Sequence, residues 1–458
     1  MTCDSTHSAG VSEPYDGYLN HVSAQIERDR VAARPPTCEF SGADPALHVR
    51  IDEIVEELRA PLCALAADLH AHPETAFQEH RSIQVITELL ERYDLPVTLG
   101  AGGVETAASS EFKGEEEAGA RRTVGIISEY DALPDIGHAC GHNVIAAAGV
   151  GAYIALALLH KRYSGSVPGV VRWLGTPAEE GHSGKEYMAR GGAFDGLDAA
   201  LMIHPYGYDV VNQVWLGRRV LSVTFTGRAA HASAQPFMGR NALDAATLAY
   251  QAIGLLRQQM LPVDRIHAIM PEGGQRASVI AETARLSMYV RSKYPDTLRD
   301  LSARVEDICH GAALMTGCAV SLEWDEHPPS LPVLSNRLLE ARFATAMARR
   351  GRTMLPAGIV PETIAASTDF GNVSYRVPAI HPLVKIASES TALHTVEFAQ
   401  AAASEAADNA VADAAVALAS TALDFLSDDA LAQGIAAEFT EAGGPVDVPS
   451  YFDPQETP

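Results

Sequence analysis

The chain has 458 residues, of which 47% are hydrophobic and 20% charged, a composition typical of a soluble globular protein with two or three domains. Its formal net charge of −24 argues against sequence-independent binding to nucleic acid, or to anionic membranes, which relies on clustered basic residues. The six cysteines show no framework spacing, and the first residues lack a basic region followed by an apolar one. We therefore expect a cytoplasmic protein without disulfides or a secretion signal.

The first part of the chain predicts an arm followed by helices. Residues 1–44 are polar and contain Pro35-Pro36, with a short helix expected near 18–30. Apolar residues then recur at helical spacing over 51–65, where Pro61 can kink or divide the helix. A second helix is expected over 83–90. The run 97–123 predicts an exposed hairpin with an acidic tip at 115–117.

Buried strands and helices alternate after this hairpin, which predicts a mostly parallel sheet. The expected strands are 124–127, 170–174 and 199–203. The nearly uncharged segment 144–160 is slightly short for a membrane span, so we expect a buried core helix.

The pattern changes near residue 216 and returns near 330, which predicts an inserted domain of roughly a hundred residues. Within the insert we expect strands at 220–225, 265–270, 285–291 and 319–324, and helices at 242–259 and 295–316. Beyond it we expect a helix at 336–349, a strand at 380–386 and a helix at 399–426. The predicted organisation is an N-terminal arm (1–44), a catalytic domain in two parts (45–215 and 329–440), an inserted α+β domain (216–328) and an irregular C-terminal tail (441–458).

Four motifs carry side chains suited to binding metal. They contribute Asp131, Cys140 and His142; Glu179 and Glu180; His204; and His394. Zinc binds sulfur, nitrogen and oxygen donors of this kind, and two neighbouring ions would need this many ligands. Alone, a histidine at a strand end is more often structural, and paired glutamates are usually solvated. Together the motifs predict a metal-dependent hydrolase in which one glutamate binds metal and its neighbour takes a proton from the metal-activated water.

These motifs resemble those of the M20 metallopeptidases, especially their amidohydrolase branch, with the strongest local match to p-aminobenzoyl-glutamate hydrolase and M20 domain-containing protein 2. The resemblance covers about residues 50 to 425. It is carried by the segments 129–134, 137–143, 176–181, 231–233, 367–374 and 394–398.

The resemblance implies an α/β fold with a mostly parallel sheet, a dinuclear metal centre and an inserted α+β lid and dimerisation domain. Cys140 would bridge two divalent ions, zinc or manganese, and the other ligands would be His142, Glu180, His204 and His394. Glu179 would be the general base, and Asp131 would orient a ligand histidine. Glu129 stands where many M20 peptidases carry a metal-binding histidine, and the amidohydrolase branch supplies His142 instead.

The resemblance also assigns roles in the inserted domain. His231 would reach the active site of the partner subunit in a homodimer and stabilise the oxyanion, although it also fits an ordinary surface histidine. Asn241 would lie near the substrate, but an N-cap explains it equally well. Arg291 would hold the substrate carboxylate, although arginine is common at strand ends. Ser278 replaces a residue of the family's substrate loop.

The sequence thus predicts a metal-dependent amidohydrolase that cleaves N-acyl amino acids or dipeptide-like amides carrying a carboxylate. Two alternatives remain open at this stage. One is a thiol hydrolase that uses Cys140 and His142, and the other is a non-catalytic amide-binding scaffold with the same fold.

Overall fold

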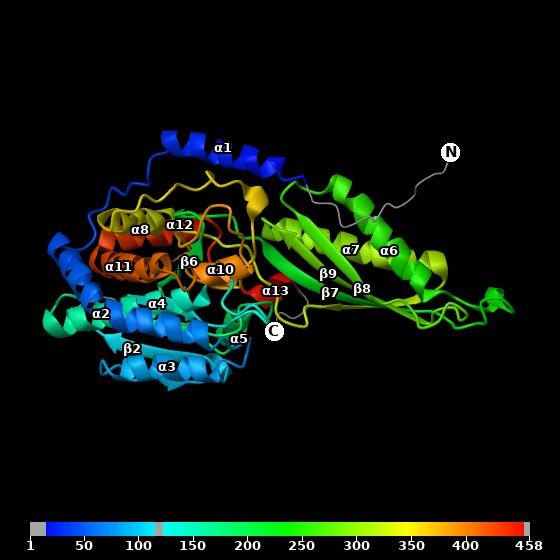
Figure 1. Cartoon of the computed structure of the whole chain (residues 1–458), viewed down its shortest axis with the longest axis horizontal. Coiled ribbons are helices and arrows are strands. Elements are labelled where there is room, and N and C mark those ends of the chain that lie inside the picture. The colour runs from blue at the N-terminus through cyan, green and yellow to red at the C-terminus, as the bar shows by residue number, and fades with distance from the viewer. Residues whose placement is uncertain (1–14, 115–121, 453–458) are drawn as a thin grey trace, which may run out of the picture.

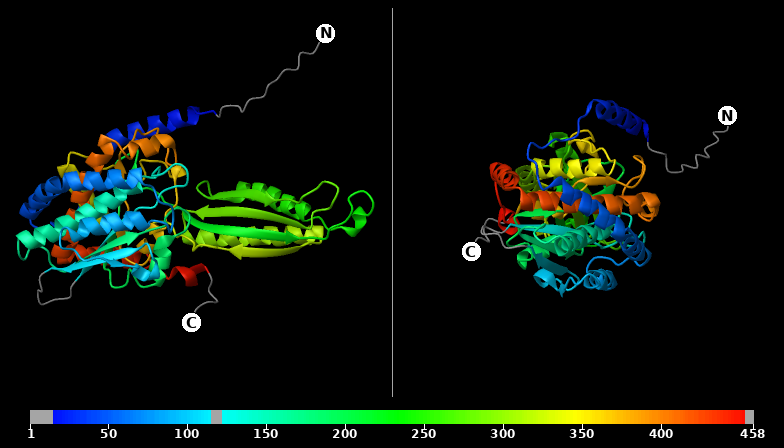
Figure 2. Two further views of the ribbon diagram at one scale, coloured as in Figure 1. Left: turned by 60° about the horizontal axis from the view of Figure 1, so that its bottom comes forward. Right: turned by 90° about the vertical axis from the view of Figure 1, so that its left-hand side faces the viewer.

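The computed structural model describes residues 15–114 and 122–452. A six-stranded sheet surrounded by helices forms the larger body, and a four-stranded sheet with two long helices projects from it (Figures 1 and 2). The chain enters and leaves the projecting part once, so that part is inserted into the larger body. This confirms the α/β fold with an inserted α+β domain.

The large sheet is mostly parallel at its centre. Strand β3 runs parallel to both β4 and β5, and β5 runs parallel to β11, whereas β2 and β1 add an antiparallel edge beside β4. In sheet order the strands are β1 (Thr98–Leu99), β2 (Ala108–Lys113), β4 (Val170–Thr176), β3 (Thr123–Glu129), β5 (Ala199–Leu201) and β11 (Ala379–Ile380). Parallel strands direct their carboxyl ends to one edge, where open α/β sheets place their sites.

Two predicted strands differ in extent from the structure. The chain leaves the large sheet after β5 and after β11, and both segments pair again, in parallel, as β6 (His204–Tyr206) and β12 (Leu383–Lys385). The predicted strand 199–203 therefore ends early, at Leu201, and the prediction of one continuous strand over 380–386 was wrong. The break puts His204 at the start of a short strand beside the sheet edge rather than at the end of β5.

Helices cover the large sheet, and α4 packs against β3, α2 and α11. The helices of this body are α1 (Gly17–Ala32), α2 (Pro45–Ala71), α3 (His80–Glu91), α4 (His142–Arg162), α5 (Gly184–Arg190), α8 (Arg337–Arg349), α9 (Phe370–Ser374), α10 (Val396–Ala401), α11 (Glu405–Ser427), α12 (Asp429–Glu441) and α13 (Val448–Phe452). Among the described residues, α4 and α11 are long and apolar enough to cross a membrane, but 89% and 94% of their apolar windows are buried inside the protein.

Three local predictions differ from the structure. Pro61 lies within a single continuous α2. The predicted helix 399–426 is two helices, because the Ser404 side chain accepts a hydrogen bond from the Ala407 N–H and starts α11 afresh. The tail expected to be irregular contains α13, where the Phe452 ring packs against Arg219 of the inserted domain. The predicted acidic tip at 115–117 lies outside the described residues.

The inserted domain has an antiparallel sheet with helices on one face only. Its elements are β7 (Gly217–Thr226), α6 (Ala242–Leu256), β8 (Arg265–Glu272), β9 (Thr283–Ser292), α7 (Pro295–Thr316) and β10 (Ala319–Trp324), with the strand order β10-β7-β9-β8. Leu221, Val223 and Phe225 alternate along β7 and form a core with α6 and α7. The even-numbered residues of β7, which include Arg218, point to the face that the helices leave uncovered.

Candidate active site

A cavity of about 560 Å³ lies between the large body and the inserted domain. Side chains from both parts line it, including Cys140, Glu179, Glu180, His182, His204, Trp215, Arg218, Tyr289, Arg291, Ser330, Thr368, Asp369 and His394. The first five come from segments that follow β3, β4 and β5 at the carboxyl edge of the sheet. Segments far apart in the sequence therefore meet where the fold class predicts a site.

The turn between β3 and α4 brings Cys140 and His142 into the cavity wall. His142 is the first residue of α4, and Cys140 is buried two residues before it. Between them Gly141 has φ +82°, and a Cβ at this position would lie 2.5 Å from Cγ of Pro205. Glycine is required here both by the left-handed backbone and by the close approach of the segment that carries His204.

The predicted ligand atoms converge in three overlapping groups, each with its atoms within 4.8 Å of one another. The groups are Cys140, His142 and His204; Cys140, Glu180 and His394; and His142, Glu179 and Glu180. Cys140, His142 and Glu180 each belong to two of the groups, so the donors form one continuous cluster. The bridging role that the resemblance gave Cys140 stays a prediction.

Hydrogen bonds orient these donors toward one another. His142 Nδ1 lies 3.1 Å from Oδ1 of Asp131, whose Oδ2 accepts a hydrogen bond of 2.9 Å from the Glu180 N–H. His204 donates from Nδ1 to the Pro205 carbonyl at 2.7 Å, which leaves the lone pair on Nε2, 3.4 Å from the sulfur of Cys140. Asp131 thus holds the ring of His142 with one carboxylate oxygen and the backbone N–H of Glu180 with the other.

Several buried polar atoms at this centre lack a hydrogen-bond partner among the described residues. They are His142 Nε2, Glu180 Oε1 and Glu129 Oε1. Glu129 Oε1 lies 3.3 Å from His142 Nε2, and Glu180 Oε1 lies 3.5 Å from His394 Nε2. Buried polar groups are normally paired, and sulfur, imidazole and carboxylate donors left this close together fit divalent cations.

Glu179 follows β4 and lies beside the proposed ligands, between the large body and the inserted domain. Burial, together with the carboxylates of Glu180 and Glu129, raises the pKa of Glu179 well above its usual value. A carboxyl group with a raised pKa can hold a proton near neutral pH, as a general acid and base must.

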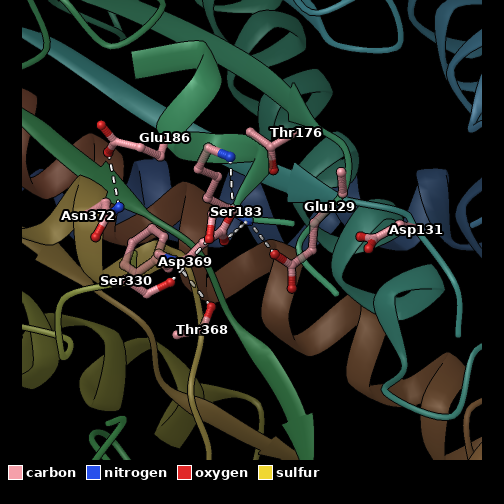
Figure 3. Close-up of polar contacts among 12 residues, drawn as sticks. Glu129, Asp131, Thr176, Ser183, Glu186, Ser330, Thr368, Asp369 and Asn372 are labelled. Atoms are coloured by element: carbon pink, nitrogen blue, oxygen red, sulfur yellow. Dashed lines mark hydrogen bonds and ion pairs between the residues drawn. The ribbon is translucent and has the colours of Figure 1, made fainter. Parts of the chain in front are cut away.

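A buried ion network that sequence reasoning missed supports the same edge of the sheet (Figure 3). Lys185 Nζ lies 2.6 Å from Glu129 Oε2 and 2.7 Å from Asp369 Oδ1, and the Lys185 N–H donates to Asp369 Oδ2 at 2.9 Å. All three side chains are almost completely buried. The network ties β3 to α5 and to the segment before α9.

Only a weak signal for this network exists in the sequence. Asp369 lies in a motif shared with the M20 family, and Glu129 stands out as a departure from it, but Lys185 on α5 belongs to no motif. A charged residue in the first turn of a short helix is usually solvent-exposed. Its burial depends on two carboxylates 56 and 184 residues away in the chain.

Three predicted residues of the inserted domain do not line the cavity of their own chain. His231 and Ser278 are exposed and lie in adjacent segments, where the Ala232 N–H donates to the Ser278 carbonyl. Asn241 caps α6, accepting a hydrogen bond of 3.2 Å from the Leu243 N–H. This is the structural role that the sequence offered for it. Contacts of these three with substrate stay predictions.

Arg291 does line the cavity, while its predicted contact with the substrate carboxylate stays a prediction. It stands on the uncovered face of β9 and stacks on the ring of Tyr289, with its guanidinium carbon 5.3 Å from the ring centroid. Arg218 approaches the same ring at 5.7 Å from the neighbouring strand β7. Neither Tyr289 nor Arg218 lies in a sequence motif that marked the site.

The thiol-hydrolase alternative fits this geometry poorly. Burial raises the pKa of the Cys140 thiol well above its usual value, whereas nucleophilic cysteines have lowered pKa values. His142 lowers the pKa of that thiol, but burial and the charge of Glu180 outweigh it, and Nε2 of His142 also lies 3.3 Å from Glu129. The alternative would also leave Glu179, Glu180 and His394 without a purpose.

Comparison with known proteins agrees with the geometry. A model of peptidase family M20/M25/M40 matches residues 125–423. Xaa-Arg dipeptidase from Mus musculus is 37% identical over 396 residues, covering 85% of this chain and 90% of that protein. One component chain of p-aminobenzoyl-glutamate hydrolase from Escherichia coli K12 is 32% identical over 320 residues, covering 66% of this chain and 65% of that protein.

Solved structures share the fold at lower sequence identity. Aminobenzoyl-glutamate utilization protein from Klebsiella pneumoniae superposes with a TM-score of 0.63 at 21% identity, covering 83% of this chain and 99% of that one. The YXEP protein of Bacillus subtilis, described as a dinuclear metal-binding peptidase of the M20 family, gives a TM-score of 0.59 at 20% identity, covering 79% and 98%.

Proposed function

Because the chain belongs to peptidase family M20/M25/M40 and is a hydrolase of amide bonds, we propose that the cavity is the active site of a metal-dependent amidohydrolase. Its substrates are dipeptides or N-acyl amino acids with a free carboxylate. The observation that carries this proposal is the convergence of sulfur, imidazole and carboxylate donors in three overlapping groups of ligand atoms, with Glu179 among them.

Two divalent ions suit these donors. His142 and His204 would hold one ion, Glu180 and His394 would hold the other, and Cys140 would touch both. When bound, the ions supply Lewis acidity and make water a stronger nucleophile near neutral pH. The thiolate and the three imidazoles favour zinc, and the carboxylate also suits manganese.

Side chains of the protein would transfer the proton and position the reacting groups. Glu179 would accept a proton from the attacking water on its carboxylate and return it to the nitrogen of the leaving amine. Asp131 would keep the ring of His142 in place through Nδ1. Arg291 would hold the substrate carboxylate, because its guanidinium reaches the cavity and its Nε has no hydrogen-bond partner among the described residues.

A pair of matched variants tests the assignment. Glu179→Gln should abolish hydrolysis of N-acyl amino acids but retain metal, whereas Glu180→Gln should lose metal as well. The measurements are turnover in a screen of N-acyl amino acids and dipeptides, run with Zn²⁺ and Mn²⁺, and metal content by elemental analysis. Full turnover by Glu179→Gln would contradict its role as the base, and wild-type metal content in Glu180→Gln would contradict its role as a ligand.

We also propose that the protein is a homodimer in which His231 enters the partner subunit's active site. The support is its exposed position on the inserted domain, outside the cavity of its own chain. If so, mixing the inactive variants Glu179→Gln and His231→Ala under subunit exchange should restore part of the activity. One of the two sites in each mixed dimer would then have both residues. Absence of restored activity in proven mixed dimers would refute action between subunits.

The remaining proposals concern organisation and location. We place an arm at 1–44, the catalytic domain at 45–215 and 329–440, the lid and dimerisation domain at 216–328, and a tail at 441–458. A reducing cytoplasmic location suits the five described cysteines, all of which are free thiols. Localisation of a tagged full-length chain would test it.

A further inference from the structure

Two arginines stand side by side on the face of the inserted sheet that looks into the cavity. Arg218 on β7 is paired in register with Arg291 on β9, and Tyr289, two residues before Arg291, points to the same face. The two guanidinium carbons lie 5.7 and 5.3 Å from the centroid of the Tyr289 ring. All three residues line the cavity.

Neither arginine makes a close ion pair with a carboxylate of the described residues, although the charges of Glu179 and Asp325 act over a longer distance on Arg291 and Arg218, respectively. Arg218 is only 7% exposed and donates to the uncharged Ser183 hydroxyl at 3.1 Å and to the Gly181 carbonyl at 3.4 Å. Arg291 Nε is buried without a hydrogen-bond partner. The next residue after Arg218, Arg219, points to the other face and pairs with Asp325 at 2.7 Å. A buried guanidinium without a counter-charge is costly, which favours an anionic ligand at this place.

The carboxylates that line the cavity are already committed. They are Glu179 and Glu180, assigned to the proton and the metal, and Asp369, bridged to Lys185 at 2.7 Å. No further carboxylate among the described lining residues is available to receive a lysine or arginine side chain. The substrate region is therefore cationic opposite the metal-binding edge.

From these charges we propose that Arg218 determines specificity and that the preferred leaving amino acid is acidic, a glutamate or an aspartate. This inference rests on the proposed amidohydrolase function. One carboxylate of the substrate binds Arg291, and the second binds Arg218. A substrate with a single carboxylate would leave one buried guanidinium unpaired, and a basic amino acid would add a third positive charge.

A set of benzoyl amino acids tests the preference on the metal-loaded, full-length enzyme. Benzoyl-glutamate is compared with benzoyl-glutamine, which has nearly the same shape but no side-chain charge, and with benzoyl-arginine. We expect kcat/KM for the glutamate substrate to exceed that for the glutamine substrate by about tenfold or more. Equal values for these two, or a preference for arginine, would overturn the inference while leaving the proposed hydrolase function intact.

Arg218→Gln and the adjacent Arg219→Gln form a matched pair. The first should reduce the glutamate-to-glutamine ratio of kcat/KM by about tenfold, and the second should leave that ratio unchanged. Because the ratio is measured within one enzyme preparation, a smaller active fraction in either variant cancels. An unchanged ratio in Arg218→Gln would overturn the role of Arg218.

A binding measurement separates the inference from catalysis. Calorimetric titration of the metal-loaded wild-type protein with L-glutamate and L-glutamine should show tighter binding of L-glutamate, and Arg218→Gln should remove the difference. Equal affinities of the wild type for the two amino acids would overturn the inference. If no amide is hydrolysed in the wider screen but glutamate is still preferred, the hydrolase proposal fails and the acidic subsite stands.

Discussion

Replacing Lys185 with methionine should destabilise the protein far more than replacing a surface lysine. Lys185 is the shared counter-ion of Glu129 and Asp369, and all three side chains are at most 1% exposed. Burial alone would lower the pKa of Lys185, but the carboxylates of Asp369 and Glu129 raise it above its usual value, so the amine stays charged. Methionine keeps the volume but leaves two carboxylates buried without a counter-charge.

The expected cost follows from that burial. Breaking a buried ion pair by removing one partner costs about 3–5 kcal/mol, so we expect Lys185→Met to lower the free energy of unfolding by at least that amount. Lys161→Met is the matched control. Lys161 makes an ion pair of nearly the same length with Asp94, at 2.8 Å, but the two side chains are 65% and 82% exposed. Removing an exposed pair costs no more than about 1 kcal/mol.

Chemical denaturation of the metal-free protein, followed by circular dichroism, measures both variants under the same conditions. The reasoning would be refuted if Lys185→Met cost no more than Lys161→Met. A further variant checks the cause. Adding Asp369→Asn to Lys185→Met should cost less than the two single changes together, because one unpaired carboxylate is then removed.

Three further results are expected. Gly141→Ala should lower stability by about 1–3 kcal/mol and reduce metal content, as measured by melting curves and metal analysis. The control is Gly351→Ala, because Gly351 has a similar φ of +77° but open space where a Cβ would lie. Equal losses in the two variants would contradict a role for the Pro205 contact. Burial raises the pKa of Glu79 from 4.5 to about 7, so the folded state binds its proton more tightly than the unfolded state does. In denaturation series, the wild type should therefore lose stability relative to Glu79→Gln as pH rises from 4.5 to 7. A difference in unfolding free energy between the two that does not change with pH would contradict this. Removing metal with a chelator should abolish hydrolysis and lower the melting temperature, both restored by Zn²⁺ or Mn²⁺, and an unchanged melting temperature would argue against ions held only by the folded chain.

Local sequence patterns predicted the long elements because their evidence is contained in a few consecutive residues. Pro295–Thr316 and Ala319–Trp324 form α7 and β10 with the expected bounds, since helical and alternating periodicity, together with proline at the start of the helix, act within one segment. The candidate ligands were likewise visible, because cysteine, histidine and paired glutamates at the ends of buried strands are unusual enough to stand out before folding is considered.

Only the tertiary structure decided which charges meet. The partners of Lys185 come from β3 and from the segment before α9, and no local pattern could show that its amine would be buried between them. The pairing of Arg218 with Arg291 likewise depends on the register of β7 against β9. Sequence specifies which side chains can ionise or bind metal, but the energy of each charge depends on its solvation and its neighbours, and folding brings those neighbours from distant parts of the chain.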